Sequence, residues 1–395
     1  MECTNVNIRI TIVNYIDITF VTTQNFKMDF PEFEYQSIKE KRIKGRYITY
    51  HHISGILKNL SANFDVEKIG DSVRELPINS VTFGKGSKRI LMWSQMHGNE
   101  STTTKAVFDL INWIGTIGKL SNSILNTCTI KIIPMLNPDG AKAYTRVNAN
   151  SVDLNRDAQD KSQPESKILR NCFEEFKPDF CFNLHDQRTI FNVGGTPKPA
   201  TVSFLAPAFD KARNISGSRA ISMQLIAAMT RELQKIIPNQ VGRYDDGFNA
   251  NCIGDTFQML GTPTILFEAG HYPEDYERES TREYIFRALI TALYVISENS
   301  FSEFSNEEYF EIPRNNKLFY DVLIKNAHRI NPFSYDKQDS IGILFKETID
   351  IDSIKFEPKI ERKGELQGFY GHKTFDCRNE VDFEDLKNQP YWNIF

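Results

Sequence analysis

Residues 88–100 read KRILMWSQMHGNE, and this stretch decides the expected fold. Its apolar part, ILMW at 90–93, is typical of a buried strand, and a helical pattern begins at Glu100. The turn between strand and helix carries His97 and Glu100. An imidazole and a carboxylate three positions apart are able to bind one divalent cation such as zinc. Because His-x-x-Glu also recurs by chance, a metal site requires further ligands elsewhere in the chain.

Strands and helices alternate on both sides of this stretch. Helical spacing at 47–64 and strand patterns at 66–69 and 78–83 precede it. Strand patterns follow at 127–136, 179–184, 201–206 and 262–267, and helical patterns at 100–118, 164–176, 221–237 and 284–296. A strand, helix and strand in succession predict a parallel, right-handed unit. The expected fold class is therefore α/β, with a mixed, mainly parallel twisted sheet flanked by helices.

The length of 395 residues predicts one large domain and a smaller one. We assign residues 28–300 to the large domain. Short strand patterns at 318–324, 341–345, 349–356 and 366–369, without long helices, predict a β-rich C-terminal region at 301–395. Residues 1–27 lack the basic start and cleavage site of a secretory signal, and we expect a disordered or non-native leader there. An edge strand is the alternative for that segment.

Composition narrows the functional classes. A hydrophobic content of 40% with 25% charged residues is ordinary for a soluble globular protein. The formal net charge of −4 gives no argument for nucleic acid or for an acidic membrane surface, and no stretch has the length of a membrane span. The six cysteines form no CxxC pair, which favours free thiols and a cytoplasmic location. The sequence does not predict the oligomeric state.

Polar residues with metal-binding or catalytic chemistry follow the predicted strands. His97 and Glu100, the turn 137–140 (NPDG), His185 and Glu268 all stand where a strand is expected to end. A parallel sheet gathers such ends along one edge, where open α/β sheets bind ligands. Catalytic zinc takes three protein ligands and leaves a position open. His97, Glu100 and His185 are the predicted ligands of one Zn2+ per chain, with Glu268 as a separate carboxylate.

The sequence resembles the zinc metallocarboxypeptidases, the funnelin-type peptidases related to pancreatic carboxypeptidases, and looks like a compact bacterial-type member. The resemblance spans about residues 88–293 and leaves out the N-terminal segment and the β-rich end. The matching stretches, in family order, are MHGNE at 96–100, LNPDG at 136–140, RVNANSVDLNRD at 146–157, NLHDQ at 183–187 and ILFEAG at 265–270.

The resemblance implies a role for each matching residue. His97, Glu100 and His185 would be zinc ligands, and Glu268 the general base that activates the attacking water. The other implied roles are oxyanion stabilisation by Arg146, capture of the terminal carboxylate of the substrate by Asn155 and Arg156, and orientation of His97 by Asp153. A mobile tyrosine of the family would correspond to Tyr244, with Tyr272 as a competitor. Asp255 lies near the expected specificity pocket, where a carboxylate would favour basic side chains, or it is a carboxylate at a helix N-terminus.

Taken singly, these residues have simpler interpretations. Arg146 and Arg156 could be ordinary surface arginines. Glu268 could be a buried carboxylate in an ion pair, and His185 could be a hydrogen-bonded histidine at a sheet edge. Asp153 could cap a loop. Only the metal site explains the ordered set.

The leading functional hypothesis is a zinc-dependent carboxypeptidase acting on a peptide or muropeptide with a free terminal carboxylate. The alternative is a zinc-dependent deacylase of N-acyl amino acids, resembling succinylglutamate desuccinylase and aspartoacylase, because the short interval between His97 and His185 and the HGNE motif also occur there. A third hypothesis is a non-catalytic peptide-binding relative. Substrate profiling separates the first two, and metal analysis tests the third.

Overall fold

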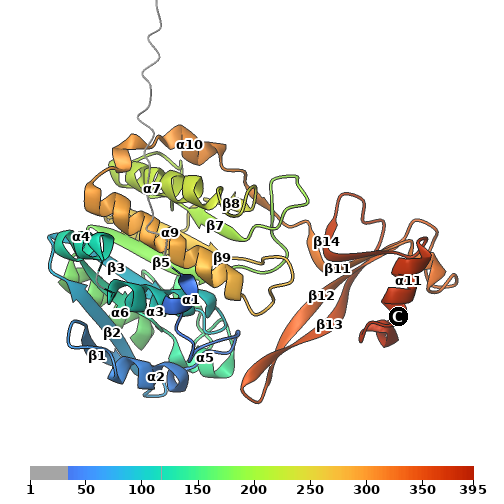
Figure 1. Cartoon of the computed structure of the whole chain (residues 1–395), viewed down its shortest axis with the longest axis horizontal. Coiled ribbons are helices and arrows are strands. Elements are labelled where there is room, and N and C mark those ends of the chain that lie inside the picture. Colours follow the sequence, from blue (N-terminus) through green and yellow to red (C-terminus); the bar gives the residue numbers. More distant parts are fainter. Residues whose placement is uncertain (1–33, 117) are drawn as a thin grey trace, which may run out of the picture. The chain divides into compact units, whose positions relative to one another are not determined.

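The larger part of the described chain is built on an eight-stranded mixed sheet, whose strands set the positions of the predicted ligands (Figure 1). The computed structural model describes residues 34–116 and 118–395, so the predicted leader at 1–27 lies outside the described residues. In spatial order the strands are β1 (Asp65–Asp71), β2 (Pro77–Gly84), β4 (Cys128–Ile133), β3 (Lys88–Ser94), β5 (Phe180–Asp186), β9 (Thr264–Ala269), β7 (Val202–Leu205) and β8 (Val241–Arg243). The central four, β4, β3, β5 and β9, are parallel to one another, whereas β1, β2 and β7 each pair with an antiparallel neighbour. The predicted mixed, mainly parallel sheet is confirmed.

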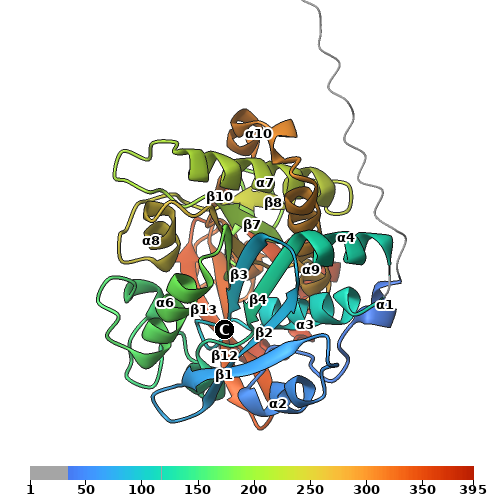
Figure 2. The same cartoon turned by 90° about the vertical axis from the view of Figure 1, so that its left-hand side faces the viewer.

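Helices cover both faces of this sheet. The helices of the larger part are α1 (Tyr35–Ile38), α2 (Tyr50–Lys58), α3 (Thr102–Ile114), α4 (Lys119–Thr127), α5 (Pro138–Ala143), α6 (Pro164–Phe176), α7 (Gly217–Leu233), α8 (Ile253–Met259) and α9 (Glu279–Glu298). Figure 2 shows α6 and α8 to one side of the strands and α3, α4 and α9 to the other. The helices α3 and α7 both pack against α9.

The apolar run of β3 is buried on both sides, as its composition predicts. Leu91 and Trp93 belong to a core cluster with residues of α6 and α8, and the Trp93 ring meets the Phe257 ring edge-on at 5.4 Å. Successive strand residues point to opposite faces, so Ile90 and Met92 bury their side chains on the other face. The strand that precedes His97 is therefore anchored in two cores.

A buried ion pair fastens α9 to α3. Arg282 donates two hydrogen bonds of 2.6 Å to the carboxylate of Asp109, and Tyr35 donates a third of 2.7 Å to the same carboxylate. Both charged side chains are fully buried. A charge in this setting requires its partner, because an unpaired buried ion costs several kcal/mol (~3–5). The pair holds α3, and with it the loop that carries Glu100.

Several predicted elements differ from the structure. The turn at 137–140 is the start of α5, because the Asn137 side chain accepts a hydrogen bond from the backbone of Gly140 and Pro138 is the first helical residue. The helix predicted at 47–64 covers only Tyr50–Lys58. The short elements α4, α8 and β8 were not predicted.

The C-terminal part forms a sheet of its own. Its strands, in the order β13 (Ser353–Gly364), β12 (Ser340–Asp350), β11 (Phe319–Lys325) and β14 (Tyr370–Asp376), pack with α11 (Glu380–Lys387) around an apolar cluster. Before this sheet come α10 (Asn306–Glu311) and β10 (Asn315–Asn316), and β10 pairs with β6 (Asn192–Val193) of the larger part. The predicted β-rich character is confirmed. Glu34–Phe395 forms one compact unit, so the boundary at residue 300 stays a prediction.

Two predicted C-terminal strands are wrong in their bounds. The pattern at 349–356 crosses the hairpin turn between β12 and β13, where Ile351 has a left-handed φ of 57° and is almost fully exposed. The pattern at 366–369 precedes β14, and Leu366 is buried in a small cluster with Tyr320 and Leu323. In residues 34–116 and 118–395, none of the helices combines the length and apolar character needed to cross a bilayer.

Candidate metal and catalytic site

Two loops pack backbone against backbone to form the floor of the site. A Cβ atom on Gly98 would lie 1.9 Å from the carbonyl carbon of Gly140, so only glycine fits between the 97–100 loop and α5. Asn137 donates from its side-chain amide to the carbonyl of Met96 at 3.1 Å. The close approach of HGNE and NPDG fixes the backbone from which His97 and Glu100 project.

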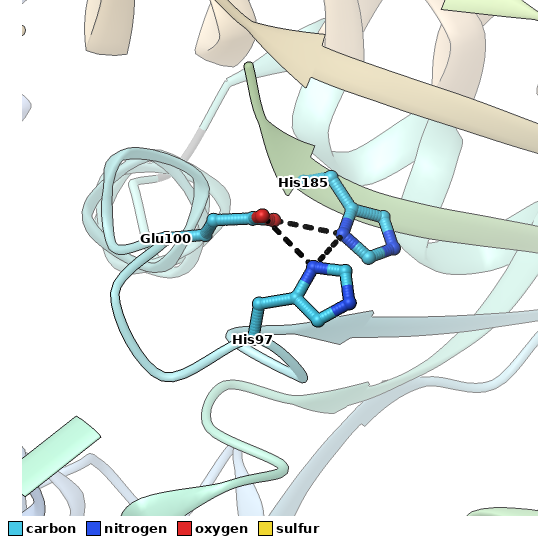
Figure 3. A group of neighbouring side chains, drawn as sticks. All are labelled: His97, Glu100 and His185. Carbon is cyan, nitrogen blue, oxygen red and sulfur yellow. Dashed lines mark hydrogen bonds and ion pairs between the residues drawn. The ribbon is translucent and has the colours of Figure 1, made fainter. Parts of the chain in front are cut away.

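Three ligand side chains converge above this floor (Figure 3). Glu100 places one oxygen 2.8 Å from Nδ1 of His97 and the other 2.8 Å from Nδ1 of His185. The two Nδ1 atoms are 3.1 Å apart. All three residues are buried, and one ligand atom of each lies within 4.8 Å of the others. The structure thus brings together the three predicted ligands.

The donor set fits a zinc ion. His97 directs Nε2 at Oδ1 of Asp153 at 3.0 Å, and a proton held there leaves Nδ1 with its lone pair towards the cluster. Burial lowers the pKa of His185. Burial alone would raise the pKa of Glu100, but the imidazoles of His97 and His185 outweigh it and leave this pKa well below its ordinary value. Burial alone would lower the pKa of His97, but Glu100 and Asp153 outweigh it and raise this pKa. Two imidazole nitrogens and a carboxylate are the ligands of an open catalytic zinc site.

Asp186 couples the ligand loop to β5. Its carboxylate accepts from the backbone N–H groups of Thr102 at 2.9 Å and Thr103 at 3.4 Å, at the N-terminus of α3. Its own backbone N–H donates to Glu100 at 3.1 Å. These contacts hold Glu100 and His185 together from two different elements.

Glu268 stands beside His185 because of the strand register. His185 of β5 and Glu268 of β9 are paired residues in neighbouring parallel strands, so their side chains project from the same face. The carboxylate is buried, and its Oε2 has no hydrogen-bond partner within the described part of the chain. Burial and the carboxylates of Glu100 and Asp186 raise the pKa of Glu268 well above its ordinary value.

A cavity of about 370 Å3, which we call the ligand cavity, opens over the cluster. Its walls include His97, Glu100, Arg146, Asn155, Arg156, His185, Tyr244, Asp255 and Glu268. The predicted metal ligands, Glu268, Arg146, Asn155, Arg156 and Tyr244 therefore line the same cavity, whereas Asp153 lies outside its walls. Tyr272, the competing tyrosine, is absent from these walls and packs its ring against Tyr284 at 5.5 Å.

Charged and polar groups are distributed unevenly in the ligand cavity. Arg146 donates from Nε to Asp153 at 3.0 Å and reaches Glu100 with Nη1 at 3.4 Å, so its positive charge lies at the cluster. The side-chain oxygen of Asn155 accepts from the backbone N–H of Ile253 at 3.1 Å, and its amide NH2 has no hydrogen-bond partner among the described residues. Arg156 donates to the carbonyl of Asn155 at 2.7 Å and is otherwise exposed.

Several residues near the cluster were missed at the sequence level. Asp186 follows His185 directly, but its function as the cap of α3 depends on tertiary contacts. Arg46, Arg188 and Arg278 line a second cavity beside Glu100, together with residues of the C-terminal sheet. No motif marks these arginines, because they come from separate segments.

Comparison with known proteins agrees with the site. The zinc carboxypeptidase family matches residues 50–197. A probable carboxypeptidase 2 of Trichophyton verrucosum is 26% identical over 156 residues, covering 38% of this chain and 29% of that protein. A gamma-D-glutamyl-L-diamino acid endopeptidase 1 of Lysinibacillus sphaericus is 38% identical over 80 residues, covering 18% and 20%. The chain thus matches less than a third of the length of these curated relatives.

A solved structure supports the same fold. The putative carboxypeptidase A from Shewanella denitrificans aligns with a TM-score of 0.54 at 19% identity, covering 63% of this chain and 69% of that one. At this identity the likeness concerns the fold alone.

Proposed function

We propose that this chain, in which residues 50–197 match the zinc carboxypeptidase family, is a zinc-dependent hydrolase that releases a C-terminal amino acid from a peptide or muropeptide. The observation that carries this proposal is the pairing of His185 with Glu268 in neighbouring strands, above a cavity that also contains Arg156. The residues proposed as metal ligand, general base and carboxylate anchor line one cavity.

A zinc ion held by His97, Glu100 and His185 would polarise the scissile carbonyl and lower the pKa of a water molecule. Glu268 would take the proton of the attacking water on its carboxylate and deliver it to the leaving amine. Arg146, at the cluster, would stabilise the negative charge that develops on the carbonyl oxygen. Asp153 would keep His97 in the tautomer that Nδ1 coordination needs.

The leaving amino acid would lie in the ligand cavity. A guanidinium is suited to a carboxylate because its planar fork donates two parallel hydrogen bonds, and Arg156 is exposed and available for this. The free amide NH2 of Asn155 would donate a further one. Tyr244 is half-buried in the cavity wall, with its ring 5.3 Å from that of Phe191, and would cover the bound residue.

Two substrate classes are compatible with this arrangement. The endopeptidase relative is named for a bond between γ-D-glutamyl and an L-diamino acid, which supports a muropeptide substrate. An N-acyl amino acid is the second candidate, because the cavity beside Glu100 that the C-terminal sheet closes has a volume of only about 290 Å3. Either substrate presents a free carboxylate next to the scissile bond.

Matched peptides test the proposed function. The zinc-loaded protein is incubated with peptides that differ only in a free or an amidated C-terminus, and with N-acyl amino acids, and products are identified by mass spectrometry. We expect the free acids to lose one residue and the amides to react at least about tenfold more slowly, since the charged contact to Arg156 is lost. Hydrolysis confined to acyl amino acids would establish the deacylase instead, and absence of any product would refute both.

Asp255 is expected to make the preference for the side chain of the released C-terminal residue depend on pH. It lies in the first turn of α8 and lines the ligand cavity, and burial raises its pKa to about 7. A carboxyl group with this pKa is mostly neutral at pH 6 and mostly ionised at pH 8. We therefore expect the kcat/KM ratio of C-terminal lysine over leucine to rise roughly tenfold from pH 6 to pH 8. Asp255→Asn should give a ratio that does not change with pH, whereas a flat ratio in the unmodified protein would contradict the assignment.

A further inference from the structure

A second cavity extends from Glu100, one of the three predicted metal ligands, to residues of the C-terminal sheet. We call it the arginine cavity, and its volume is about 290 Å3. It shares Glu100, Arg146 and Arg188 with the ligand cavity, whereas Asn155, Arg156 and Tyr244 line the ligand cavity alone. A substrate whose terminal carboxylate is held by Arg156 therefore has a path past the cluster into the arginine cavity.

Four arginines line the arginine cavity. Arg146 is already engaged by Asp153 and Glu100, so Arg46, Arg188 and Arg278 supply the remaining guanidinium groups. Arg278 is 1% exposed and donates only to backbone carbonyls, those of Ala269 and Gln187. Within residues 34–116 and 118–395, no carboxylate lies at ion-pair distance from Arg278, and the Nε atoms of Arg278 and Arg46 have no hydrogen-bond partner. Arg188 is exposed and makes no hydrogen bond or ion pair with any described residue. Arg46, Arg188 and Arg278 therefore each have at least one N–H donor without a partner among the described residues.

The carboxylates of Asp186, Asp321 and Glu347, which line the same cavity, already accept hydrogen bonds or form an ion pair. Asp186 accepts from the backbone at the start of α3, and Asp321 accepts from the Tyr276 hydroxyl at 3.0 Å and from the backbone of Phe345 at 2.7 Å. Glu347 pairs with Arg46 at 3.1 Å and accepts from Tyr144 at 2.5 Å. Burial, and to a lesser extent the positive charge of the nearby Arg46, lower the pKa of Arg278 to about 10. An anionic ligand would satisfy this excess of donors.

Aromatic side chains supply the rest of the wall. The Tyr276 ring lies 5.3 Å from the rings of both Phe345 and Phe356, and all three line the cavity. Such a surface accommodates methylene groups but not further charge. The volume is at the lower end of the range for ligand pockets, so only a small group fits.

We propose that the arginine cavity binds the acyl side of the scissile bond and selects a short acyl group that carries its own carboxylate. This inference rests on the proposed function and deepens it, because it names the substrate class. The methylene chain would lie against the aromatic wall, and the carboxylate would meet the spare donors of Arg278, Arg46 and Arg188. The C-terminal sheet supplies Phe345, Glu347 and Phe356 and thereby limits the length of the acyl group.

A pair of isosteric probes tests this selection. Glutaryl-L-lysine and pentanoyl-L-lysine have the same leaving amino acid and nearly the same chain, and differ in one terminal carboxylate. With the full-length, zinc-loaded protein we expect kcat/KM, measured from lysine release, to be about 10- to 100-fold higher for the glutaryl compound. A ratio near one, or a preference for the pentanoyl compound, overturns the proposal.

Arg188→Gln tests one of the three arginines, a residue that lines both the arginine cavity and the ligand cavity. Because Arg188 is exposed and unpaired within the described residues, this variant should fold normally, and we expect it to reduce the glutaryl-to-pentanoyl ratio several-fold. The matched control Arg378→Gln changes an exposed arginine outside the cavity and should keep the ratio. An unchanged ratio in Arg188→Gln refutes the assignment of the cavity. Hydrolysis of free-acid peptides without hydrolysis of either probe overturns only this inference, whereas a protein that cleaves no peptide and no acyl amino acid overturns the proposed function as well.

Discussion

Replacing Glu268 with glutamine is expected to lower kcat/KM by about 10²- to 10⁴-fold, the contribution usual for a positioned general base. The amide has nearly the same shape as the carboxyl group but cannot accept the proton of the attacking water. Because Glu268 is not among the three converging ligands, zinc content measured by elemental analysis should stay at one per chain. Loss of activity with retained metal is the pattern that separates a base from a ligand.

Two controls accompany this variant. Glu175→Gln changes an exposed glutamate on α6, outside the ligand cavity, and should retain full activity. The melting temperature of Glu268→Gln should not fall, because the buried Oε2 has no hydrogen-bond partner among the described residues and the substitution removes a buried charge. If Glu268→Gln kept more than about a tenth of the activity, or lost its zinc, the assigned role would be wrong.

The positions of the ligands could be predicted because each is tied to a local signal. His97 and Glu100 follow an apolar run that is typical of a buried strand, and the structure places them in the loop after β3. The parallel order of strands then predicts that distant strand ends meet at one edge. This prediction needs only the order of strands and helices along the chain, which the spacing of apolar residues indicates.

The bounds of single elements were less predictable, for reasons visible at particular residues. Ile351 continues an alternating apolar pattern, yet it sits exposed at the tip of a hairpin, because the turn is decided by the pairing of β12 with β13. Asn137 and Pro138 suit both a turn and a helix start, and the contact with Met96 favours the helix. Local propensity does not contain these tertiary contacts.

The arginine cavity could not be predicted at all. Arg46, Arg188 and Arg278 belong to separate loops, and Glu347 belongs to the C-terminal sheet. Each is an ordinary charged residue in its own stretch of sequence. Their proximity follows from how β12 and β13 lie beside the loops after β5 and β9, and only the folded structure contains that information.

Replacing His185 with alanine is expected to remove the metal and the activity together. A zinc site with two remaining ligands binds far more weakly, because His97 and Glu100 then provide only two of the three protein ligands of a catalytic site. We expect the zinc content to fall from one per chain to a small fraction after dialysis at micromolar protein, and kcat/KM to fall below detection. Added zinc should raise the melting temperature of the unmodified apoprotein but not of the variant, since a ligand stabilises the folded state only in proportion to its binding.

The matched control is His51→Ala, at an exposed histidine of α2 that lies outside the three-residue cluster. This variant should keep its zinc, its activity and its zinc-dependent rise in melting temperature. The thermal shift is informative even if the correct substrate has not been found, because it reports metal binding without turnover. If His185→Ala retained stoichiometric zinc, the buried imidazole would be a structural neighbour of the site, and the pairing of His185 with Glu268 would need another explanation than catalysis.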